Sequence, residues 1–584
     1  MRLITLTFVS FSLAACMTTP TTSPPADAAA SKDVFTHQRV TAHRDGDDLL
    51  SAGLGRDALL NPIAPAMSDA AHPTAAELRR RTLYANWRGI ADLYGTVTAI
   101  PNMPGREFHA YAQLPGAKQP HRVLAQIPDA FDATKRCLIV TASSGSRGVY
   151  GAIGSVSYYG LPRGCAVVHT DKGTGTGFFD VATGEGVQAN GTRAARGADL
   201  EFDPGTLAVA GETRVAIKHA HSSDNPEADW GRHVLQAARF GLHALNDAFP
   251  AQAPFTAANT RIIAFGLSNG GGAVLRAGEL DAEGLLDGVV AAAPNIGVSG
   301  SQHLFELSIE AALYQPCALL ALPDAPIFLP EAAHQAVASA RCASLRAAGW
   351  IEGDTPAAQA ESGLAKLRAN GWRDQSLHLA GLQTGFDLWR AVAALYAQSY
   401  ARATPDAPVC GYTFAQRDAM GPPRLATAAE RALWWSDASG IAPTAGVGLV
   451  DGLATAVADP SWSGLMCLHA LLDGDDAIAQ QVRASIAATR ASAQTRVPTV
   501  IVHGDHDSII PVEFSSRPYL AAARTNAAQI ALWEVANAQH FDAFVALPKL
   551  VGMRPLLPQA YAAMDALIAH LDGGAMPSDR KIAP

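Results

Sequence analysis

The stretch "RIIAFGLSNGGG" (residues 261–272) decides both the fold we expect and the chemistry that this fold carries. An apolar run of strand length ends in glycines, with one hydroxyl, Ser268, between Gly266 and Gly270. A Gly-x-Ser-x-Gly pattern is typical of a sharp strand-to-helix turn, where glycines avoid side-chain clashes and the serine oxygen is presented to a base. The following "GAVLRAGEL" (272–280) favours a helix. We therefore predict that Ser268 is a nucleophile.

Short apolar runs recur on both sides of this stretch and alternate with helical patterns, one of which covers residues 230–249. The central runs are continuous rather than alternating, which indicates strands covered on both faces. The candidate strands are residues 107–114, 122–127, 137–143, 165–170, 261–266, 288–293, 498–504 and 529–536. This alternation predicts an α/β fold with a doubly wound, mainly parallel sheet.

Two long stretches interrupt the alternation. Residues 171–230 are rich in glycine and have the composition of a loop, and residues 296–496 are rich in alanine and helix formers. We interpret 296–496 as a large, mainly helical cap inserted into the sheet domain; the alternative is an independent domain joined at these points. Residues 32–295 would then form the first part of the sheet domain, and residues 497–584 its last strands and C-terminal helix.

The N-terminus has the layout of an export signal. Residues 1–16, "MRLITLTFVSFSLAAC", place one basic residue before an apolar run that ends in small residues and Cys16. The ending "LAAC" resembles a bacterial lipobox, in which the cysteine is lipidated; an ordinary secretory peptide is the alternative. Residues 17–31 then form a flexible Thr/Pro/Ala tether. We expect an exported protein, either secreted or periplasmic, whose only membrane link would be a lipid anchor at Cys16, as in an outer-membrane lipoprotein.

Six cysteines remain when Cys16 is set aside, and an even number favours disulfides in an exported chain. They are Cys137, Cys165, Cys317, Cys342, Cys410 and Cys467. The pair Cys137 and Cys165 is the best supported, because each stands directly before a strand-like run, and neighbouring parallel strands would bring their first residues together. The connectivity is not decided by the sequence, and buried free thiols are the alternative.

A serine hydroxyl needs a base, and in sheets of the α/β-hydrolase type the partners follow in the order Ser, Asp, His. The stretch "PTVIVHGDHDSIIP" (498–511) is an apolar strand followed by acidic residues. We choose Asp507 as the carboxylate and keep Asp505 as the second choice; turn formation after the strand is the alternative for both. His540, in "NAQHFDAF" (537–544) after the last strand, is the predicted base.

The negatively charged intermediate of acyl transfer needs backbone N–H donors. We predict one donor at Asn269, the residue after the nucleophile. The second should come from the "SSGSRG" loop (143–148) after the third strand, around Ser144 or Gly145. The alternative is a flexible loop without such a role.

Other chemistries have little support in this sequence. The net charge of −9 is spread along the chain without a basic stripe, so nothing points to nucleic acid. His219 and His221 have a spacing that zinc could use, but no third ligand and no His-Glu-x-x-His motif accompanies them. The run "GTGTG" (173–177) lacks the Lys-Ser/Thr of a phosphate loop, and no Gly-x-Gly-x-x-Gly motif opens a strand–helix unit. We predict neither a metal nor a cofactor.

Several longer stretches resemble the D-(-)-3-hydroxybutyrate oligomer hydrolases. They are "IVTASSGSRGVYGAIG" (139–154), "AVVHTDKGTGTG" (166–177), "KHAHSSDNPEADWG" (218–231) and "GLSNGGGAVLRAGE" (266–279), together with the signal peptide. The resemblance covers nearly the whole chain after the signal and places the family's nucleophile on Ser268. It implies an exported bacterial serine esterase that acts on short ester oligomers released when poly(3-hydroxybutyrate) is depolymerised. The lipobox-like ending departs from expectation and leaves free secretion or tethering open.

The implied substrate directs attention to two cations. An oligomer of 3-hydroxybutyrate is a chain of methyl-bearing esters that ends in a carboxylate, so it would suit an apolar pocket with one positive charge. Arg147 and Lys172 lie on loops at the carboxyl ends of strands, where such sheets bind ligands. We predict that either binds the terminal acid; an ordinary surface charge is the alternative.

Three rival functions stay open at this stage. The first is a carboxylesterase of the tannase or feruloyl-esterase kind, which would use the same triad on an aromatic ester. The second is a peptidase, although N-terminal propeller repeats are missing. The third is a non-catalytic surface binding protein on a hydrolase fold; such proteins usually lose a triad member, whereas candidates for all three are present here.

Overall fold

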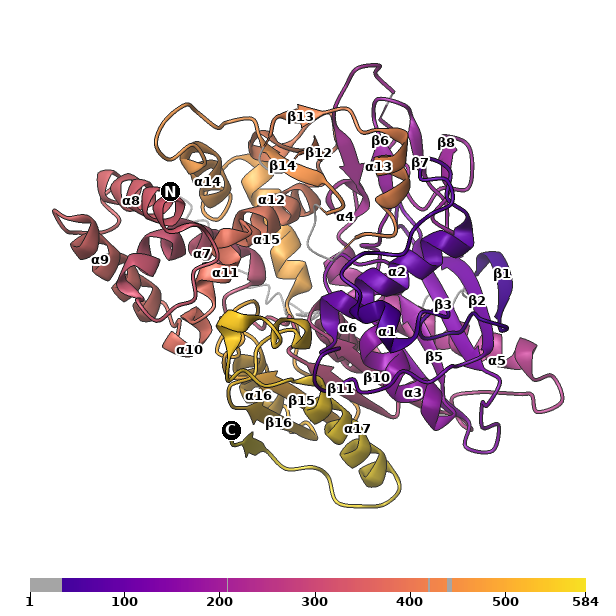
Figure 1. The fold of residues 1–584 in the computed structure, drawn as a ribbon. Coiled ribbons are helices and arrows are strands. Elements are labelled where there is room, and N and C mark those ends of the chain that lie inside the picture. Colours follow the sequence, from indigo (N-terminus) through magenta and orange to yellow (C-terminus); the bar gives the residue numbers. More distant parts are fainter. Residues whose placement is uncertain (1–33, 207, 419–420, 439–443) are drawn as a thin grey trace, which may run out of the picture.

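The computed structural model describes residues 34–206, 208–418, 421–438 and 444–584 (Figure 1). The predicted export signal (1–16), including Cys16, and the predicted tether (17–31) lie outside the described residues. The described chain forms a ten-stranded sheet, two smaller sheets and the helices that surround them.

The ten-stranded sheet is the frame of the molecule (Figure 1). Its strands, in order across the sheet, are β1 (Thr36–His43), β2 (Gly105–Ala112), β3 (His121–Pro128), β5 (Ala166–Thr170), β4 (Cys137–Ala142), β10 (Arg261–Leu267), β11 (Gly288–Ala292), β15 (Thr499–Gly504), β16 (Ile530–Val535) and β17 (Arg580–Ile582). From β5 to β17 all neighbours are parallel, whereas β1, β2 and β3 pair antiparallel. This is an α/β-hydrolase sheet, which confirms the predicted fold class, and all eight predicted strands lie in it.

Two strands at the edges of the sheet, β1 and β17, were not predicted. Most side chains of β1 are exposed, and β17 has only three residues. An edge strand buries few side chains, so neither segment carries the apolar run by which the other strands were recognised.

Helices cover both faces of the sheet, as the continuous apolar strands require. In β10, Ile262 packs in a core cluster with α5 (Pro226–Ala248) and α6 (Asn269–Leu280). The next residue, Ile263, packs on the other face with α17 (Leu557–Leu571). The central strands are therefore buried on both sides, and their carboxyl ends all meet at one edge of the sheet.

The glycine-rich stretch 171–230 contains a second sheet, so the expected loop was wrong for its middle part. Its antiparallel strands, of three residues each, are in order β8 (Arg193–Ala195), β7 (Glu185–Val187), β6 (Phe178–Asp180) and β9 (Val215–Ile217). Phe179, Phe202 and Ala216 form its small core. Strands this short show no readable alternation between long glycine-containing turns.

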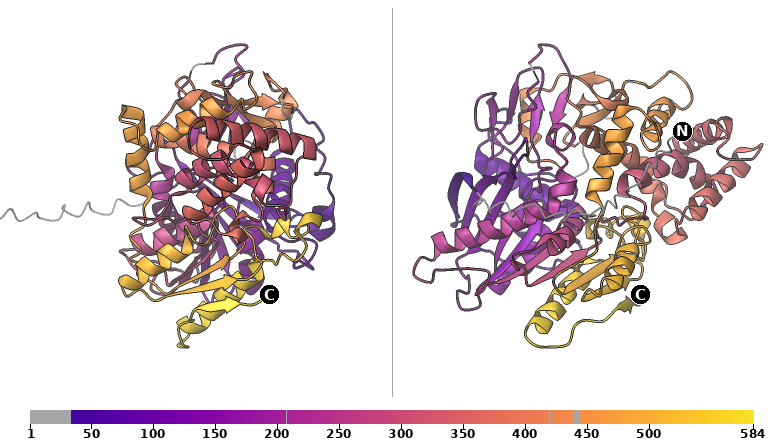
Figure 2. Two further views of the ribbon diagram at one scale, coloured as in Figure 1. Left: turned by 90° about the vertical axis from the view of Figure 1, so that its left-hand side faces the viewer. Right: turned by 180° about the vertical axis from the view of Figure 1, so that it is seen from behind.

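Between β11 and β15 the chain leaves the sheet for what we call the α7–α15 region (residues 304–489). Its helices are α7 (Leu304–Ala318), α8 (Glu331–Ala347), α9 (Pro356–Ala369), α10 (Asp374–Leu377), α11 (Ala380–Gly385), α12 (Leu388–Ala401), α13 (Ala428–Leu433), α14 (Trp462–Ala470) and α15 (Ala477–Thr489). A small sheet of β13 (Pro423–Arg424), β12 (Tyr412–Arg417) and β14 (Val447–Asp451) lies among them. Figures 1 and 2 show this region beside the sheet, with α13 and β12–β14 at the end of the molecule opposite the C-terminus. It is mainly helical; its action as a cap stays a prediction.

The helix α7 forms the centre of this region. Within the described residues, Leu304–Ala321 is the one helical stretch with the length and hydropathy of a membrane span, and 78% of it is buried inside the protein. A helix that is apolar on all sides and enclosed by other elements is typical of a protein core.

Three disulfides use the six cysteines. They are Cys137–Cys165, Cys317–Cys342 and Cys410–Cys467. The first joins the starts of the adjacent strands β4 and β5, the pairing favoured by the sequence, with 4.7 Å between the Cα atoms. The other two lie within the α7–α15 region, where one joins α7 to α8 and the other joins the chain before β12 to α14.

Buried polar contacts fasten the α7–α15 region to the helices of the sheet domain. The Tyr400 hydroxyl on α12 donates a hydrogen bond to the Glu227 carboxyl on α5. Asn225 donates from Nδ2 to the Ser485 carbonyl at 3.0 Å. Burial raises the pKa of Glu227 to about 7, against the opposing effects of the Tyr400 hydroxyl and the Lys172 charge.

Replacing Cys137 and Cys165 together by serine opens a bridge that spans 28 residues. The unfolded chain gains conformational freedom, so we expect the free energy of unfolding to fall by about 2–4 kcal/mol, measured in urea without reductant. A thiol titration of the denatured proteins serves as the control, since neither wild type nor variant should react at these six positions. Unchanged stability would contradict the role of this bridge.

Glu227→Gln should stabilise the protein at alkaline pH and not at acidic pH. The folded-state pKa lies near 7 and the ordinary value near 4.5, so the wild-type carboxyl costs stability as the pH rises from 4.5 through 7, and the full cost remains above 7. A neutral amide avoids this cost, which is about 3 kcal/mol. Thermal unfolding at pH 8 and pH 4.5 measures it; an equal difference at both pH values would contradict the explanation.

Candidate active site

Ser268 occupies the turn between β10 and α6. Its backbone has φ 62° and ψ −125°, an uncommon conformation for a residue with a side chain. A Cβ atom at position 266 would lie 2.1 Å from the Gly270 carbonyl oxygen, and one at position 270 would lie 2.3 Å from the Ala142 carbonyl oxygen. The two glycines of the motif are therefore required by backbone packing, which forces Ser268 into this turn.

The structure brings the three predicted residues together at the carboxyl edge of the sheet. His540, on the loop after β16, places Nε2 2.8 Å from the Ser268 hydroxyl oxygen. Asp507, on the loop after β15, places Oδ2 2.7 Å from His540 Nδ1. A carboxylate beside Nδ1 keeps the proton on that nitrogen, so Nε2 is free to accept the serine proton. All three side chains are buried.

Asp507 is held as an anion by its surroundings. Its Oδ1 accepts hydrogen bonds from the backbone N–H groups of Ile509 at 2.9 Å and Ile510 at 2.8 Å. Burial by itself would raise its pKa, but the adjacent His540 and His503 outweigh burial and lower the pKa well below the usual value. Asp507 therefore stays ionised at neutral pH.

Asp505, the second choice for the acid, has other partners. Its Oδ1 lies 2.6 Å from His506 Nδ1 and accepts the backbone N–H of Asn537 at 2.8 Å. These contacts join two neighbouring loops. The geometry therefore identifies Asp507, and not Asp505, as the partner of His540, a choice that the sequence left open.

His503 is a member of the site that the sequence reasoning missed. Its Nε2 faces two acceptors, Asp507 Oδ2 at 3.2 Å and the Ile510 carbonyl at 2.8 Å, so this nitrogen carries the proton. Its Nδ1 then accepts from the Ser516 hydroxyl at 2.6 Å, at the start of α16 (Ser516–Thr525). His503 therefore helps to orient the Asp507 carboxylate, because it contacts the same oxygen, Oδ2, as His540. Its place within the strand gave no signal of this role.

Asn269, the predicted oxyanion donor, is the first residue of α6, where backbone N–H groups have no acceptor within the helix. Its side chain is fixed on both sides. Nδ2 donates to the Tyr396 hydroxyl oxygen at 3.2 Å, and Oδ1 accepts from Asn295 at 3.1 Å. Tyr396 lies on α12, so the α7–α15 region contacts the residue next to the nucleophile. No local sequence pattern predicts this contact.

The loop with Ser144 and Gly145 follows β4, and Lys172 forms hydrogen bonds with it. The Lys172 ammonium donates to the Gly145 carbonyl, to Ser143 Oγ at 3.0 Å and to Thr174 Oγ1 at 3.2 Å. Gly145 has φ 58°, and the Ser144 hydroxyl is buried. These contacts describe a built loop rather than a flexible one.

The two predicted cations are both buried, so the surface-charge alternative is wrong for each. Lys172 is occupied by the three loop oxygens, and burial lowers its pKa to about 7. Arg147 lies in the same loop, and its guanidinium carbon lies 5.4 Å from the centre of the Phe541 ring.

His219 and His221, both on α4 (Lys218–His221), have separate partners. His219 Nδ1 lies 2.7 Å from Ser146 Oγ, and its ring meets the Tyr396 ring edge-on at 5.1 Å. His221 Nδ1 accepts from the Ile217 backbone at 3.1 Å. In the described ranges no three His, Cys, Asp or Glu side chains are grouped so that they could hold a metal ion.

Comparisons with known proteins show the family of this chain. The model of the 3HB-oligomer hydrolase (3HBOH) family matches residues 13–582. A D-(-)-3-hydroxybutyrate oligomer hydrolase of Paracidovorax citrulli is 37% identical over 91% of this chain and 86% of its own length. One from Polaromonas naphthalenivorans is 34% identical over 99% of this chain and 92% of its own length.

Among solved structures, tannin acyl hydrolase from Aspergillus niger is similar, with a TM-score of 0.38 and 13% identity over 95% of this chain and 86% of that chain. Feruloyl esterase B from Aspergillus oryzae has a TM-score of 0.37 and 12% identity over 93% of this chain and 88% of that chain. These likenesses are too distant to guide an inference of function. The family match and the relatives extend over nearly the whole sequence, and the chain therefore belongs to the 3HB-oligomer hydrolase family and is a carboxylic ester hydrolase.

Proposed function

We propose that this protein hydrolyses the ester bonds of short 3-hydroxybutyrate oligomers to monomers, with Ser268, His540 and Asp507 as its catalytic triad. The observation that carries the proposal is the continuous hydrogen-bonded chain from Ser268 Oγ through His540 to Asp507, with links of 2.8 and 2.7 Å. The substrate class comes from the family to which the chain belongs and from the names of its relatives.

Acylation follows from the geometry. Ser268 Oγ attacks the ester carbonyl carbon while its proton passes to His540 Nε2. The tetrahedral intermediate collapses, the ester C–O bond breaks, and His540 gives the proton to the leaving alkoxide. Water then attacks the acyl-enzyme with His540 as the base, which releases the acid and restores the serine. Asp507 stabilises the imidazolium in both halves of the cycle.

The backbone N–H of Asn269 and one N–H of the loop around Ser144 and Gly145 are proposed as the oxyanion donors. Donors that are fixed before the reaction pay no reorganisation cost when charge develops. Two observations support a fixed arrangement: the side chain of Asn269 is held on both sides, and Lys172 holds the carbonyl of Gly145.

We further propose that the enzyme works outside the cytoplasm, downstream of poly(3-hydroxybutyrate) depolymerisation. The signal-like residues 1–16 and the three disulfides support export, because structural disulfides persist in oxidising compartments. A lipid anchor at Cys16 would tether it to the outer membrane. No resident cofactor is invoked, since the triad supplies both the nucleophile and the proton transfers.

Ser268→Ala should lower kcat on the 3-hydroxybutyrate trimer by at least about 10⁴-fold, since no nucleophile remains. Wild type should react with a fluorophosphonate probe and the variant should not. Parallel assays on methyl ferulate and on a peptide amide test the rival esterase and peptidase functions. Faster hydrolysis of either rival substrate than of the trimer would reject the proposed substrate, and an unlabelled wild type would reject the serine mechanism.

Asp507→Asn should lower kcat on the trimer by about 10³–10⁴-fold, because the amide no longer selects the required tautomer or stabilises the imidazolium. Asp505→Asn is the matched control, two residues away on the same loop, and should change kcat by less than about threefold. Steady-state kinetics on folded proteins, checked by circular dichroism, make the comparison. A larger loss at 505 than at 507 would reverse the assignment.

A further inference from the structure

One buried arginine in this protein has no carboxylate partner among the described residues. Four arginines of the described chain are buried, and three of them form ion pairs: Arg79 with Glu107, Arg122 with Glu201 and Arg341 with Asp459. Arg147, 3% exposed, pairs with no described carboxylate. Buried charges are almost always paired, because the loss of hydration is costly.

The guanidinium of Arg147 is also short of hydrogen bonds. It donates one, from an Nη atom to the Gly89 carbonyl at 3.3 Å, at the end of α2 (Ala75–Ile90). Its Nε is buried without a partner in the described structure. Burial lowers the pKa of Arg147 to about 10, so the group stays protonated at neutral pH. A buried guanidinium whose N–H groups are not all hydrogen-bonded can bind an anionic ligand.

The position of Arg147 relative to the triad gives the direction of that ligand. Its guanidinium carbon lies 5.4 Å from the Phe541 ring centre, and the Phe541 ring centre lies 4.4 Å from that of His540. Arg147 and the His540 imidazole therefore lie against the same aromatic ring, that of Phe541. His540 delivers its proton to the leaving alkoxide, so the leaving group lies beside His540 during acylation.

We infer that Arg147 binds the free carboxylate of the oligomer's acid end and so directs Ser268 to the ester bond next to that end. This inference rests on the proposed function and extends it. In the bond so selected, the leaving group is a single 3-hydroxybutyrate, whose alkoxide meets His540 while its carboxylate meets Arg147. Ser268 Oγ forms the acyl bond to the shortened oligomer, the ester C–O bond breaks, and the serine proton leaves on the monomer hydroxyl. The enzyme thus shortens its substrate by one unit per turnover, from the carboxyl end.

Arg147 suits this role better than Lys172, the other cation predicted for it. Lys172 already donates to three oxygens of the protein. Two belong to Ser143 and Gly145 in the loop 143–148, and the third is the hydroxyl oxygen of Thr174. Arg147 offers a planar fork that matches a carboxylate with two parallel hydrogen bonds.

The first experiment compares the trimer as free acid with its carboxyl-terminal methyl ester. For Arg147→Met we expect kcat/KM on the free acid to fall about 30-fold or more, since one partner of a buried charge pair is lost, and kcat/KM on the methyl ester to change by less than about threefold. Arg147→Lys, which keeps the charge without the fork, should lose less on the free acid. It supplies the same comparison if the methionine variant fails to fold, as judged by thermal unfolding and fluorophosphonate labelling.

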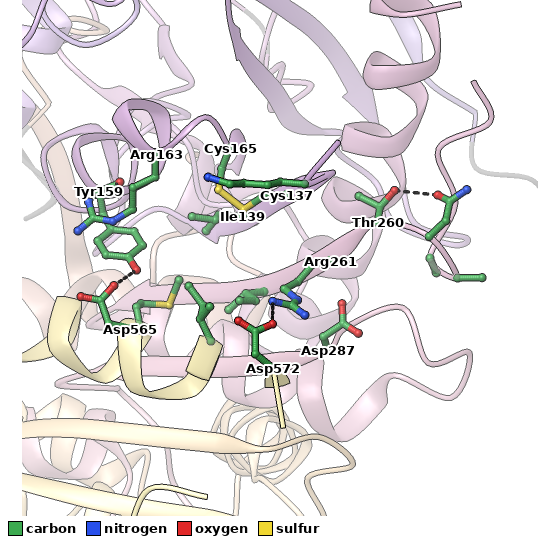
Figure 3. Close-up of a pocket in the computed structure, with 17 residues that line it drawn as sticks. Cys137, Ile139, Tyr159, Arg163, Cys165, Thr260, Arg261, Asp287, Asp565 and Asp572 are labelled. Carbon is green, nitrogen blue, oxygen red and sulfur yellow. Dashed lines mark hydrogen bonds and ion pairs between the residues drawn. A yellow bond between two sulfur atoms is a disulfide. The ribbon is translucent and has the colours of Figure 1, made fainter. Parts of the chain in front are cut away.

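The matched control is Arg163→Met. Arg163 also lies over an aromatic ring, 3.9 Å from the centre of Tyr159, but it lines a pocket of about 720 Å³ at the amino ends of the strands, away from the triad (Figure 3). This variant should change kcat/KM on both substrates by less than about threefold. Equal losses on the free acid and the methyl ester for Arg147→Met would overturn the inference.

A second experiment follows the direction of attack. A trimer whose carboxyl-terminal unit carries ¹³C should release labelled monomer first, as read by mass spectrometry at early times. Unlabelled monomer released first would overturn the inference even if the kinetics agree. Hydrolysis of neither substrate by wild type would instead reject the proposed function, so the two failures are distinguishable.

Discussion

The close approach of three backbone segments around Ser268 is the constraint on which the site depends. The end of β10, the start of α6 and the end of β4 touch at positions where only glycine fits, with carbonyl oxygens 2.1 and 2.3 Å from the sites of absent Cβ atoms. This contact holds Ser268 in a strained conformation that costs about 1–3 kcal/mol. Burial of the strands on both faces offsets that cost. The same contact places the loop after β4 beside the nucleophile.

From this point the rest of the site is built by the parallel sheet. Because β10, β15 and β16 run in the same direction, the loops after them emerge at one edge, and residues as distant in sequence as Ser268, Asp507 and His540 meet there. The acid is then held by two histidines, because His540 and His503 both contact its Oδ2 atom. The positive charge of Arg147 lies against the Phe541 ring, which also contacts the imidazole of His540.

The sheet and the triad could be predicted because buried parallel strands are continuous apolar runs, and functional loops follow their carboxyl ends. Asp507 and Asp505 could not be separated, because both follow the same strand, and only the backbone N–H groups of Ile509 and Ile510 and the reach of His540 distinguish them. His503 was not predicted because it lies within β15, a strand whose sequence indicates only a structural role. The contact from Tyr396 to Asn269 joins segments more than a hundred residues apart, and no local pattern records such a contact.

The partners of the cysteines have a consequence for how the chain matures. Each bridge closes before the next pair begins along the sequence, at 137–165, 317–342 and 410–467, so the three loops neither overlap nor nest. If the chain is threaded through a membrane from its N-terminus, as the proposed export requires, each of these six cysteines emerges with its native mate before the next pair does. For the exported chain that we propose, oxidation in order of emergence would thus favour the native pairing of these six cysteines.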